Sequence, residues 1–308
     1  MRIALVTTSY PLGDLASDLA LGDDDPAGHF VRAETRALRR EGHIVTVIAP
    51  TVTPQGAFGW PGVAARVRER PLRLLDAARW VAWARRELRR MGPFQRIVAH
   101  WAVPSAVPIA LGAPPSSELE VVSHGGDVRL LAALPGPART AVVRCIALRA
   151  TSWRFVSNAL LASLVGRLAR PDAEHVMRVA RVRPPDIDLY DAGADVRARR
   201  DALAGLPFSV VVARLVASKR VERAIEQVAR GLAPQPLVVV GDGPERGRLE
   251  KLARARAVDA RFVGKVGRRD ALAWIGAADV LLHASHAEGL STVVREATAL
   301  GTRVEYVD

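Results

Sequence analysis

Two basic residues in one predicted turn could hold a diphosphate. Arg214 and Lys219 lie five residues apart, after the apolar segment 208–213. Two fixed cations at this spacing can straddle a diphosphate and balance its negative charges without a metal ion. Because basic residues are common at protein surfaces, the pair indicates a phosphate site only in the company of further residues.

Two carboxylates flank a predicted helix start further along the chain. Residues 285–292 follow an apolar segment, and Ser291 or Thr292 is the expected N-cap of a helix whose backbone N–H groups favour a phosphate. Glu288 lies in the preceding loop, and Glu296 lies just over one turn inside the helix. A carboxylate at this place can accept hydrogen bonds from both hydroxyl groups of a ribose.

A glycine-containing turn and a loop histidine are the other candidates. The turn 241–244 contains Gly241 and Gly243, which allow the backbone to approach a flat base or a ribose, although such a sequence is more often only a tight turn. His124 follows an apolar segment and precedes two glycines, which gives its ring room to project across a cleft between two domains. The other six histidines are interpreted as incidental.

The elements that must position these residues are predicted as two α/β halves. In the first half, a strand at 2–7, a helix at 30–40 and a strand at 44–49 form a β–α–β unit, whose crossover predicts a parallel sheet. The other predicted strands of the first half are 97–99, 120–123, 155–157 and 176–180. Ligands of such sheets bind at the carboxyl ends of the strands, where the candidate residues lie.

The second half repeats the alternation, with strands predicted at 208–213, 236–240, 261–263 and 280–283. The fold class is therefore α/β, with two Rossmann-like, doubly wound parallel sheets. Consecutive prolines at 184–185 exclude both helix and sheet interior. The predicted domains are 1–186 and 207–308, joined by a linker at 187–206.

The composition is that of a globular protein with anionic partners. The 308 residues carry a formal net charge of +12, and 41 of the 44 basic residues are arginine. Nucleic acid is not expected, because the arginines are scattered and neither zinc-finger spacing nor an aromatic RNA-binding signature accompanies them. With one cysteine, no signal peptide and no long apolar run, the chain is predicted to be cytoplasmic.

Two charged segments each have two interpretations. The aspartates at 23–25 could bind a metal ion, but no strand precedes them to aim their carboxylates, so a solvated loop is favoured and no metal site is expected. The stretch 66–91 holds apolar residues among nine arginines. It is either an amphipathic helix on an anionic membrane surface, at the inner face of the membrane, or a core-packing helix with a solvated basic face, which is favoured.

Taken together, the sequence resembles the retaining glycosyltransferases of family 4, which have the two-domain GT-B fold. The resemblance covers nearly the whole chain and is strongest in the second half. There, two glutamates separated by seven residues occur together with the family's other motifs. In the family's order and spacing, these are Val212-Ala213-Arg214-Leu215 with Lys219, Gly241-Asp242-Gly243-Pro244-Glu245, Ala278-Asp279-Val280, Ser285, Glu288-Gly289-Leu290-Ser291, Glu296-Ala297 and Gly301-Thr302.

The resemblance implies a role for each candidate. Arg214 and Lys219 would hold the donor diphosphate, and Glu288 with the adjacent backbone would hold the donor sugar. His124 would reach that sugar from the first domain. The implied donor-binding residues are Asp127, which supports the histidine loop, Gly28, Gly241, Gly243, Ser285, Gly289, Leu290, Ser291 and Glu296.

The implied reaction moves a sugar from a UDP-, GDP- or ADP-sugar to a glycan, lipid or small-molecule acceptor. Anomeric configuration is retained, and the implied route is front-face attack, in which the leaving phosphate takes the acceptor's proton. The protein's main contribution would be to stabilise the departing diphosphate. No metal ion and no cofactor are implied.

Two features depart from the family's pattern. The family has paired glycines in the loop after the first strand, whereas the segment 13–28 offers only Gly28 just before the helix. The chain also stops at Asp308, before the family's C-terminal segment, and 304–308 departs from the apolar strand expected there. A partner protein or self-association that covers the second domain is therefore expected, and the alternative function is a catalytically weak or inactive nucleotide-sugar-binding subunit.

Overall fold

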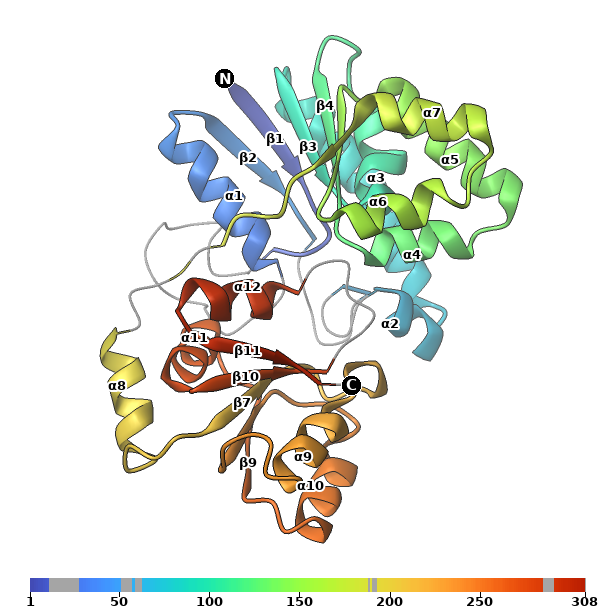
Figure 1. Cartoon of the computed structure of the whole chain (residues 1–308). Coiled ribbons are helices and arrows are strands. Elements are labelled where there is room, and N and C mark those ends of the chain that lie inside the picture. The colour runs from blue at the N-terminus through green and yellow to red at the C-terminus, as the bar shows by residue number, and fades with distance from the viewer. Residues whose placement is uncertain are drawn as a thin grey trace. The chain divides into compact units, whose positions relative to one another are not determined.

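In the computed structural model, residues 1–10, 28–50, 57–58, 63–187, 189, 193–284 and 291–307 are described. Contacts divide the chain into two compact units, with the division between Asp186 and Ile187. Unit 1 ends at Asp186, and unit 2 begins at Ile187. Each unit has its own β-sheet (Figure 1).

Unit 1 contains a parallel sheet of six strands in the order β2-β1-β3-β4-β5-β6. The strands are β1 (Arg2–Val6), β2 (Ile44–Ile48), β3 (Arg96–His100), β4 (Glu118–Ser123), β5 (Ser152–Phe155) and β6 (Ala180–Val182). Residues 3–6 of β1 are fully buried on both faces, as expected for a central strand of a parallel sheet.

Helices connect these strands. They are α1 (His29–Arg40), α2 (Val63–Glu69), α3 (Arg73–Met91), α4 (Gly126–Ala133), α5 (Gly136–Arg149), α6 (Asn158–Val165) and α7 (Arg170–Val179), with an irregular helical segment η2 (Ala102–Ile109) and a short η3 (Ala110–Gly112) after β3. Helix α1 buries Val31, Thr35 and Leu38, which share one face at helical spacing. The first β–α–β unit predicted from the sequence is confirmed.

Unit 2 contains a parallel sheet of five strands in the order β11-β10-β7-β8-β9. The strands are β7 (Ser209–Val212), β8 (Leu237–Val240), β9 (Ala260–Gly264), β10 (Val280–His283) and β11 (Arg303–Tyr306). The helices are α8 (Gly193–Asp201), η4 (Ala217–Lys219), α9 (Val221–Ala229), α10 (Arg246–Ala255), α11 (Arg268–Ala277) and α12 (Thr292–Ala299).

The sheet of unit 2 is covered by helices on both faces (Figure 1). Val211 of β7 packs into one apolar cluster with residues of α9 and α10, whereas its neighbour Val210 packs into another with residues of α11 and α12. Because successive side chains of a strand point to opposite faces, the two clusters are the two sides of one doubly wound sheet. The predicted α/β fold class is thus confirmed.

Four segments differ from the sequence-based expectation. The strand predicted at 155–157 lies earlier, at 152–155, and Ser157 is the N-cap of α6. The predicted strand at 176–180 is wrong: Val176 is a buried residue of α7, whose first turn holds a proline, and only Ala180 enters β6. Within the expected linker, α8 forms and its Val196 packs against the core of unit 2. The C-terminal segment, expected to depart from a strand, forms β11, which pairs with β10 and tolerates polar residues because it lies at the sheet edge.

No helix in the described part of the chain is both long and apolar enough to cross a membrane.

Candidate active site

In each unit, the strand order changes direction at one point, where open parallel sheets bind ligands. In unit 2 the chain runs from β7 through β8 to β9 on one side, and then places β10 and β11 on the other side of β7. In unit 1 the corresponding point lies between β1 and β3. The turns after these strands therefore mark the candidate site of each unit.

The turns after β7 and β8 are joined by backbone hydrogen bonds. Leu215 N donates to Asp242 O over 2.9 Å, and Glu245 N donates to Leu215 O over 3.0 Å. A Cβ atom on Gly241, whose φ is 133°, would lie 1.9 Å from Ala213 O, and one on Gly243 would lie 2.4 Å from Leu215 O. The close approach of the turn after β7 therefore leaves no room for a side chain at either glycine. A contact of Gly241 or Gly243 with a sugar donor stays a prediction.

The two predicted clamp cations lie in this joined pair of turns. Arg214 follows β7 directly, and Lys219 ends η4. Burial lowers the pKa of His283, at the end of β10, and the charge of Lys219 lowers it further. β10 pairs with β7, so the turn that ends at Lys219 follows the strand beside β10, on the side of β7 where the strand order changes.

Glu296 is 6% exposed and is paired with a residue that sequence reasoning missed. Arg268, at the start of α11, donates from Nη1 to Glu296 Oε1 in α12 over 2.5 Å. Burial raises the pKa of Glu296, and the Arg268 guanidinium opposes that rise. Ser291 is the N-cap of α12, with its hydroxyl accepting from Val294 N.

Some predicted site residues lie outside the described residues. These are Ser285, Glu288, Gly289, Leu290 and the aspartates at 23–25. Among the residues that the structure does describe, no group of three or more histidine, cysteine or carboxylate side chains could hold a metal ion.

In unit 1, Asp127 connects the loops after β3 and β4. Its Oδ1 accepts from the backbone N–H groups of His124 and Gly125, each over 3.1 Å, and its Oδ2 accepts from Ala102 N over 2.9 Å. The position of His124 is thereby fixed relative to the end of β3. Gly28 is the N-cap of α1, with φ of 82°, and a Cβ atom there would lie 2.5 Å from Ser9 O.

The His124 side chain packs in a cluster of rings at the carboxyl ends of β3 and β4. Phe30 of α1 lies 4.3 Å from it and Trp101 lies 5.2 Å from it, measured between ring centroids. Trp101 has φ of 73°, a conformation that is strained for a residue other than glycine and is characteristic of functional sites. Burial, then the charges of His100 and Arg154, hold the pKa of His124 well below its usual range.

His100, which was expected to be incidental, contacts His124. Its Nδ1 lies 2.9 Å from Nε2 of His124, and the two rings are nearly parallel, with an interplanar angle of 12°. The sequence did not reveal this contact because 24 residues separate the two histidines, so that only the pairing of β3 with β4 brings them together. The sequence signal that could have drawn attention to His100 was its position at the end of a predicted apolar strand.

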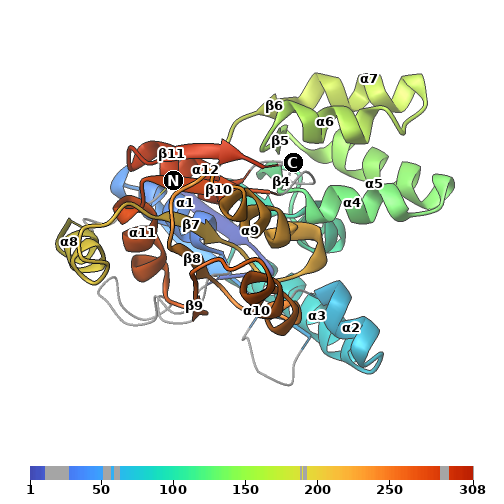
Figure 2. The same ribbon diagram turned by 60° about the horizontal axis from the view of Figure 1, so that its bottom comes forward.

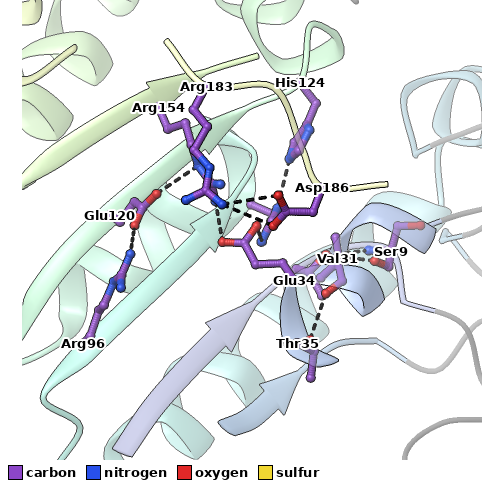
Figure 3. Close-up of polar contacts among 12 residues, drawn as sticks. Ser9, Val31, Glu34, Thr35, Arg96, Glu120, His124, Arg154, Arg183 and Asp186 are labelled. Carbon is purple, nitrogen blue, oxygen red and sulfur yellow. Dashed lines mark hydrogen bonds and ion pairs between the residues drawn. The ribbon is translucent and has the colours of Figure 1, made fainter. Parts of the chain in front are cut away.

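Polar residues inside the strands were also missed. Glu34 of α1, Glu120 of β4 and Arg154 of β5 are all buried, and Arg154 forms an ion pair with each glutamate (Figure 3). Charged residues are rarely buried without a partner. Glu120 and Arg154 could therefore have been singled out as charges within otherwise apolar strands.

The glycosyl transferases group 1 family matches residues 196–304. The lipopolysaccharide core biosynthesis glycosyltransferase LpsE of Rhizobium meliloti (strain 1021) is 36% identical over 108 residues, which are 35% of this chain and 32% of LpsE. The match thus spans about a third of the length of that curated relative.

Two solved structures are similar over 99% of this chain and 80% of their own. Sucrose-phosphate synthase from Thermosynechococcus elongatus has a TM-score of 0.67 at 22% identity, and Anabaena HepE in complex with UDP-glucose has a TM-score of 0.62 at 16% identity. The chain therefore has the fold of the GT-B glycosyltransferases, and the match to the glycosyl transferases group 1 family lies in unit 2.

Proposed function

We propose that this chain transfers a sugar from a nucleoside diphosphate sugar to an acceptor, with retention of anomeric configuration. The observation that carries the proposal is the pair of hydrogen-bonded turns after β7 and β8, with Lys219 beside the end of β10. These turns lie within the residues that match the glycosyl transferases group 1 family. HepE, which has a similar fold, binds UDP-glucose.

In this proposal unit 2 binds the nucleotide. Arg214 and Lys219 balance the charge that grows on the diphosphate as the bond to the sugar breaks. Arg268 donates to Oε1 of Glu296 and keeps the buried carboxylate ionised, while Oε2 accepts a ribose hydroxyl. Glu288 contacts the donor sugar, as the family resemblance implies.

Retention is favoured by the electrostatics of unit 1. A protein base that took the acceptor's proton would need a pKa near the working pH. His124 has its pKa well below the usual range, because it is buried and faces His100 and the charge of Arg154, so it is a weak base. The acceptor oxygen then bonds to the anomeric carbon as the bond to phosphate breaks, and the leaving phosphate takes the acceptor's proton.

We also propose that unit 1 binds an anionic membrane surface and that the acceptor is linked to a lipid. On α3, the residues at 72, 75, 79, 83, 86 and 90 follow helical spacing and form what we call the outer stripe. Leu72 is 78% exposed, Leu75 57% and Trp83 41%, and the other three are arginines with exposed side chains. Apolar side chains among cations suit an anionic interface.

The opposite face of α3 is occupied by the core of unit 1. Trp80, Ala84 and Leu88 are buried, and the Trp80 ring packs edge-on against Phe58 at 5.0 Å. Figure 2 shows α2 beside α3, and the stretch 66–91 that they span holds nine arginines and three acidic residues. The core-packing interpretation therefore describes the buried face of α3. The membrane proposal concerns the outer stripe on its opposite face.

Donor turnover tests the proposed function. We expect release of the nucleotide from one of UDP-, GDP- and ADP-glucose in the presence of a chelator, with the anomeric configuration of the product determined by NMR. An inverted product would contradict retention, and restoration of activity only by a divalent metal would contradict the metal-free clamp. A donor that binds but is never turned over would favour the nucleotide-sugar-binding subunit instead.

A further inference from the structure

A chain of buried polar side chains leads from the interior of unit 1 to His124 (Figure 3). Arg154 donates from Nη2 to Glu34 over 2.5 Å and forms an ion pair with Glu120, whose Oε1 lies 2.9 Å from Nε of Arg154. Glu120 also pairs with Arg96. The second oxygen of Glu34, Oε2, lies 3.6 Å from Nε2 of His100. His100 is 1% exposed, and its Nδ1 forms the hydrogen bond with His124.

The geometry of this chain selects one tautomer of each histidine. A carboxylate oxygen faces Nε2 of His100, and no atom in the described structure forms a hydrogen bond with that nitrogen. A proton on Nε2 is attracted to the carboxylate, whereas a lone pair there would oppose the charge of Glu34 in a buried site. Neutral His100 therefore carries its proton on Nε2 and an acceptor lone pair on Nδ1.

The tautomer of His124 follows from that of His100. Since Nδ1 of His100 accepts, Nε2 of His124 donates, and Nδ1 of His124 is left with a lone pair. The described structure contains no hydrogen bond to Nδ1 of His124, whose side chain is partly exposed.

We infer that His100, held by Glu34, is a positioning residue that fixes His124 as the Nε2-protonated tautomer, so that its Nδ1 accepts a hydrogen bond from a hydroxyl group of the bound sugar. The inference rests on the proposed function in assigning a sugar to His124. The tautomer itself rests only on unit 1. Asp127 fixes the backbone of the loop, and Phe30, at 4.3 Å, restricts the plane of the His124 ring.

Nitrogen NMR of the full chain, labelled with 15N at histidine, tests the tautomer directly. Imidazole nitrogen shifts separate the two neutral tautomers and the cation, and a His124→Gln variant assigns the His124 signals. We expect a neutral, Nε2-protonated His124 at neutral pH, and the same form under mildly acidic conditions, because burial, then His100 and Arg154, lower the pKa of His124. A His124 protonated on Nδ1, or a cation at neutral pH, would overturn the inference.

Two variants of His100 test whether it fixes the tautomer of His124. Asparagine offers a carbonyl oxygen near the place of Nδ1, so His100→Asn should keep the His124 tautomer and change kcat by less than about threefold, the effect of a fraction of one hydrogen bond. His100→Leu removes the acceptor, so it should give mixed His124 tautomers and lower kcat about tenfold, with a smaller effect on KM. An unchanged His124 spectrum in folded His100→Leu would also overturn the inference.

The turnover of His124→Ala separates the two proposals. If wild-type His124 has the expected tautomer while His124→Ala transfers sugar at the wild-type rate, the contact between His124 and the sugar is wrong and the tautomer assignment stands. If His124→Ala is impaired while the wild-type tautomer is the other one, the proposed function stands and the role of His100 is wrong.

Discussion

Single residues of the candidate site depend on partners that lie far away in sequence. Glu296 was identified from its spacing to Glu288, but its partner is Arg268, 28 residues earlier in the chain, which opposes the rise of the Glu296 pKa caused by burial. Spacing could not reveal this pair, because the two side chains meet only when α11 and α12 pack on the same face of the sheet. His124 depends on His100 in the same way, across two paired strands.

Replacing Arg268 with methionine should weaken nucleotide binding and make it dependent on pH. Burial raises the pKa of Glu296 and Arg268 lowers it, so removal of the cation lets the carboxyl group hold its proton up to a higher pH. The variant should lose affinity for UDP as the pH falls towards neutral, where the wild type still binds, by about tenfold for one lost charge-assisted hydrogen bond.

Titration calorimetry with UDP over a range of pH measures this effect. Arg269→Met is the matched control, since its neighbouring guanidinium is 58% exposed and pairs with Asp195 instead of Glu296. Equal affinity and equal pH dependence in the two variants would show that Arg268 does not maintain the charge of Glu296.

Replacing Lys219 with alanine should lower turnover more than donor affinity. The charge on the leaving diphosphate is greatest in the transition state, so a cation beside it stabilises that state most. By analogy with the loss of one oxyanion donor, kcat should fall by about a hundredfold. Arg214→Lys should also be harmful, because an ammonium group cannot reproduce a forked bidentate contact.

Steady-state kinetics with the accepted donor, and circular dichroism to confirm folding, check the Lys219 effect. Lys251→Ala is the matched control, because Lys251 is an exposed lysine of α10 in the same unit. Wild-type turnover in folded Lys219→Ala would contradict the clamp, and a requirement for divalent metal in that case would direct attention to the aspartates at 23–25.

At the scale of elements, the sequence predicted what depends on local pattern. The strands β7, β8, β9 and β10 were found because each is a short, largely apolar run that ends in a turn. The segment 176–180 was wrongly predicted as a strand, because apolar residues at the end of a helix resemble a short buried strand. The signal against a strand was Arg170-Pro171, which starts the helix. The residues that cover α8 and β11 are distant in sequence, so their packing could not be predicted.

Two glycines of unit 2 should respond in opposite directions to alanine. At Gly241 the new Cβ atom would meet Ala213 O at 1.9 Å, and φ is positive, so unfolding free energy should fall by at least about 2 kcal/mol. At Gly247, on the surface of α10, no atom lies within 4 Å, and alanine should stabilise by up to about 1 kcal/mol. Urea denaturation of both variants measures the difference, and equal effects would contradict the close approach of the two turns.

The outer stripe of α3 should be needed for binding to anionic vesicles. Leu75→Ser combined with Trp83→Ser removes apolar anchors that are 57% and 41% exposed, so co-sedimentation with vesicles containing phosphatidylserine should be lost. Leu148→Ser is the control, because Leu148 of α5 is 70% exposed and lies outside the stripe. Binding by the wild type that depends on neither anionic lipid nor salt would contradict the proposal, since the cations would then contribute nothing.

At the scale of the whole molecule, the two units have different chemistry at corresponding places. At the change of strand direction, unit 2 gathers a basic turn and a carboxylate paired with arginine, whereas unit 1 gathers aromatic rings and a pair of neutral histidines. The first set suits a charged nucleotide, and the second suits an uncharged sugar. A nucleotide alone should therefore act on unit 2 and leave unit 1 nearly unchanged.

UDP should protect the amides of unit 2 from hydrogen exchange. A ligand at about 100 times its Kd stabilises the folded state by about 2.7 kcal/mol, and the gain is confined to openings that release the ligand. We expect slower exchange in β7, β8 and the turns after them, with little change in β5 and β6 of unit 1. In Lys219→Ala the same protection should need more UDP, whereas Lys251→Ala should match the wild type. GDP and ADP extend the test to the other nucleotides, and the donor site assigned to unit 2 would be wrong if one of the three bound while protecting only unit 1.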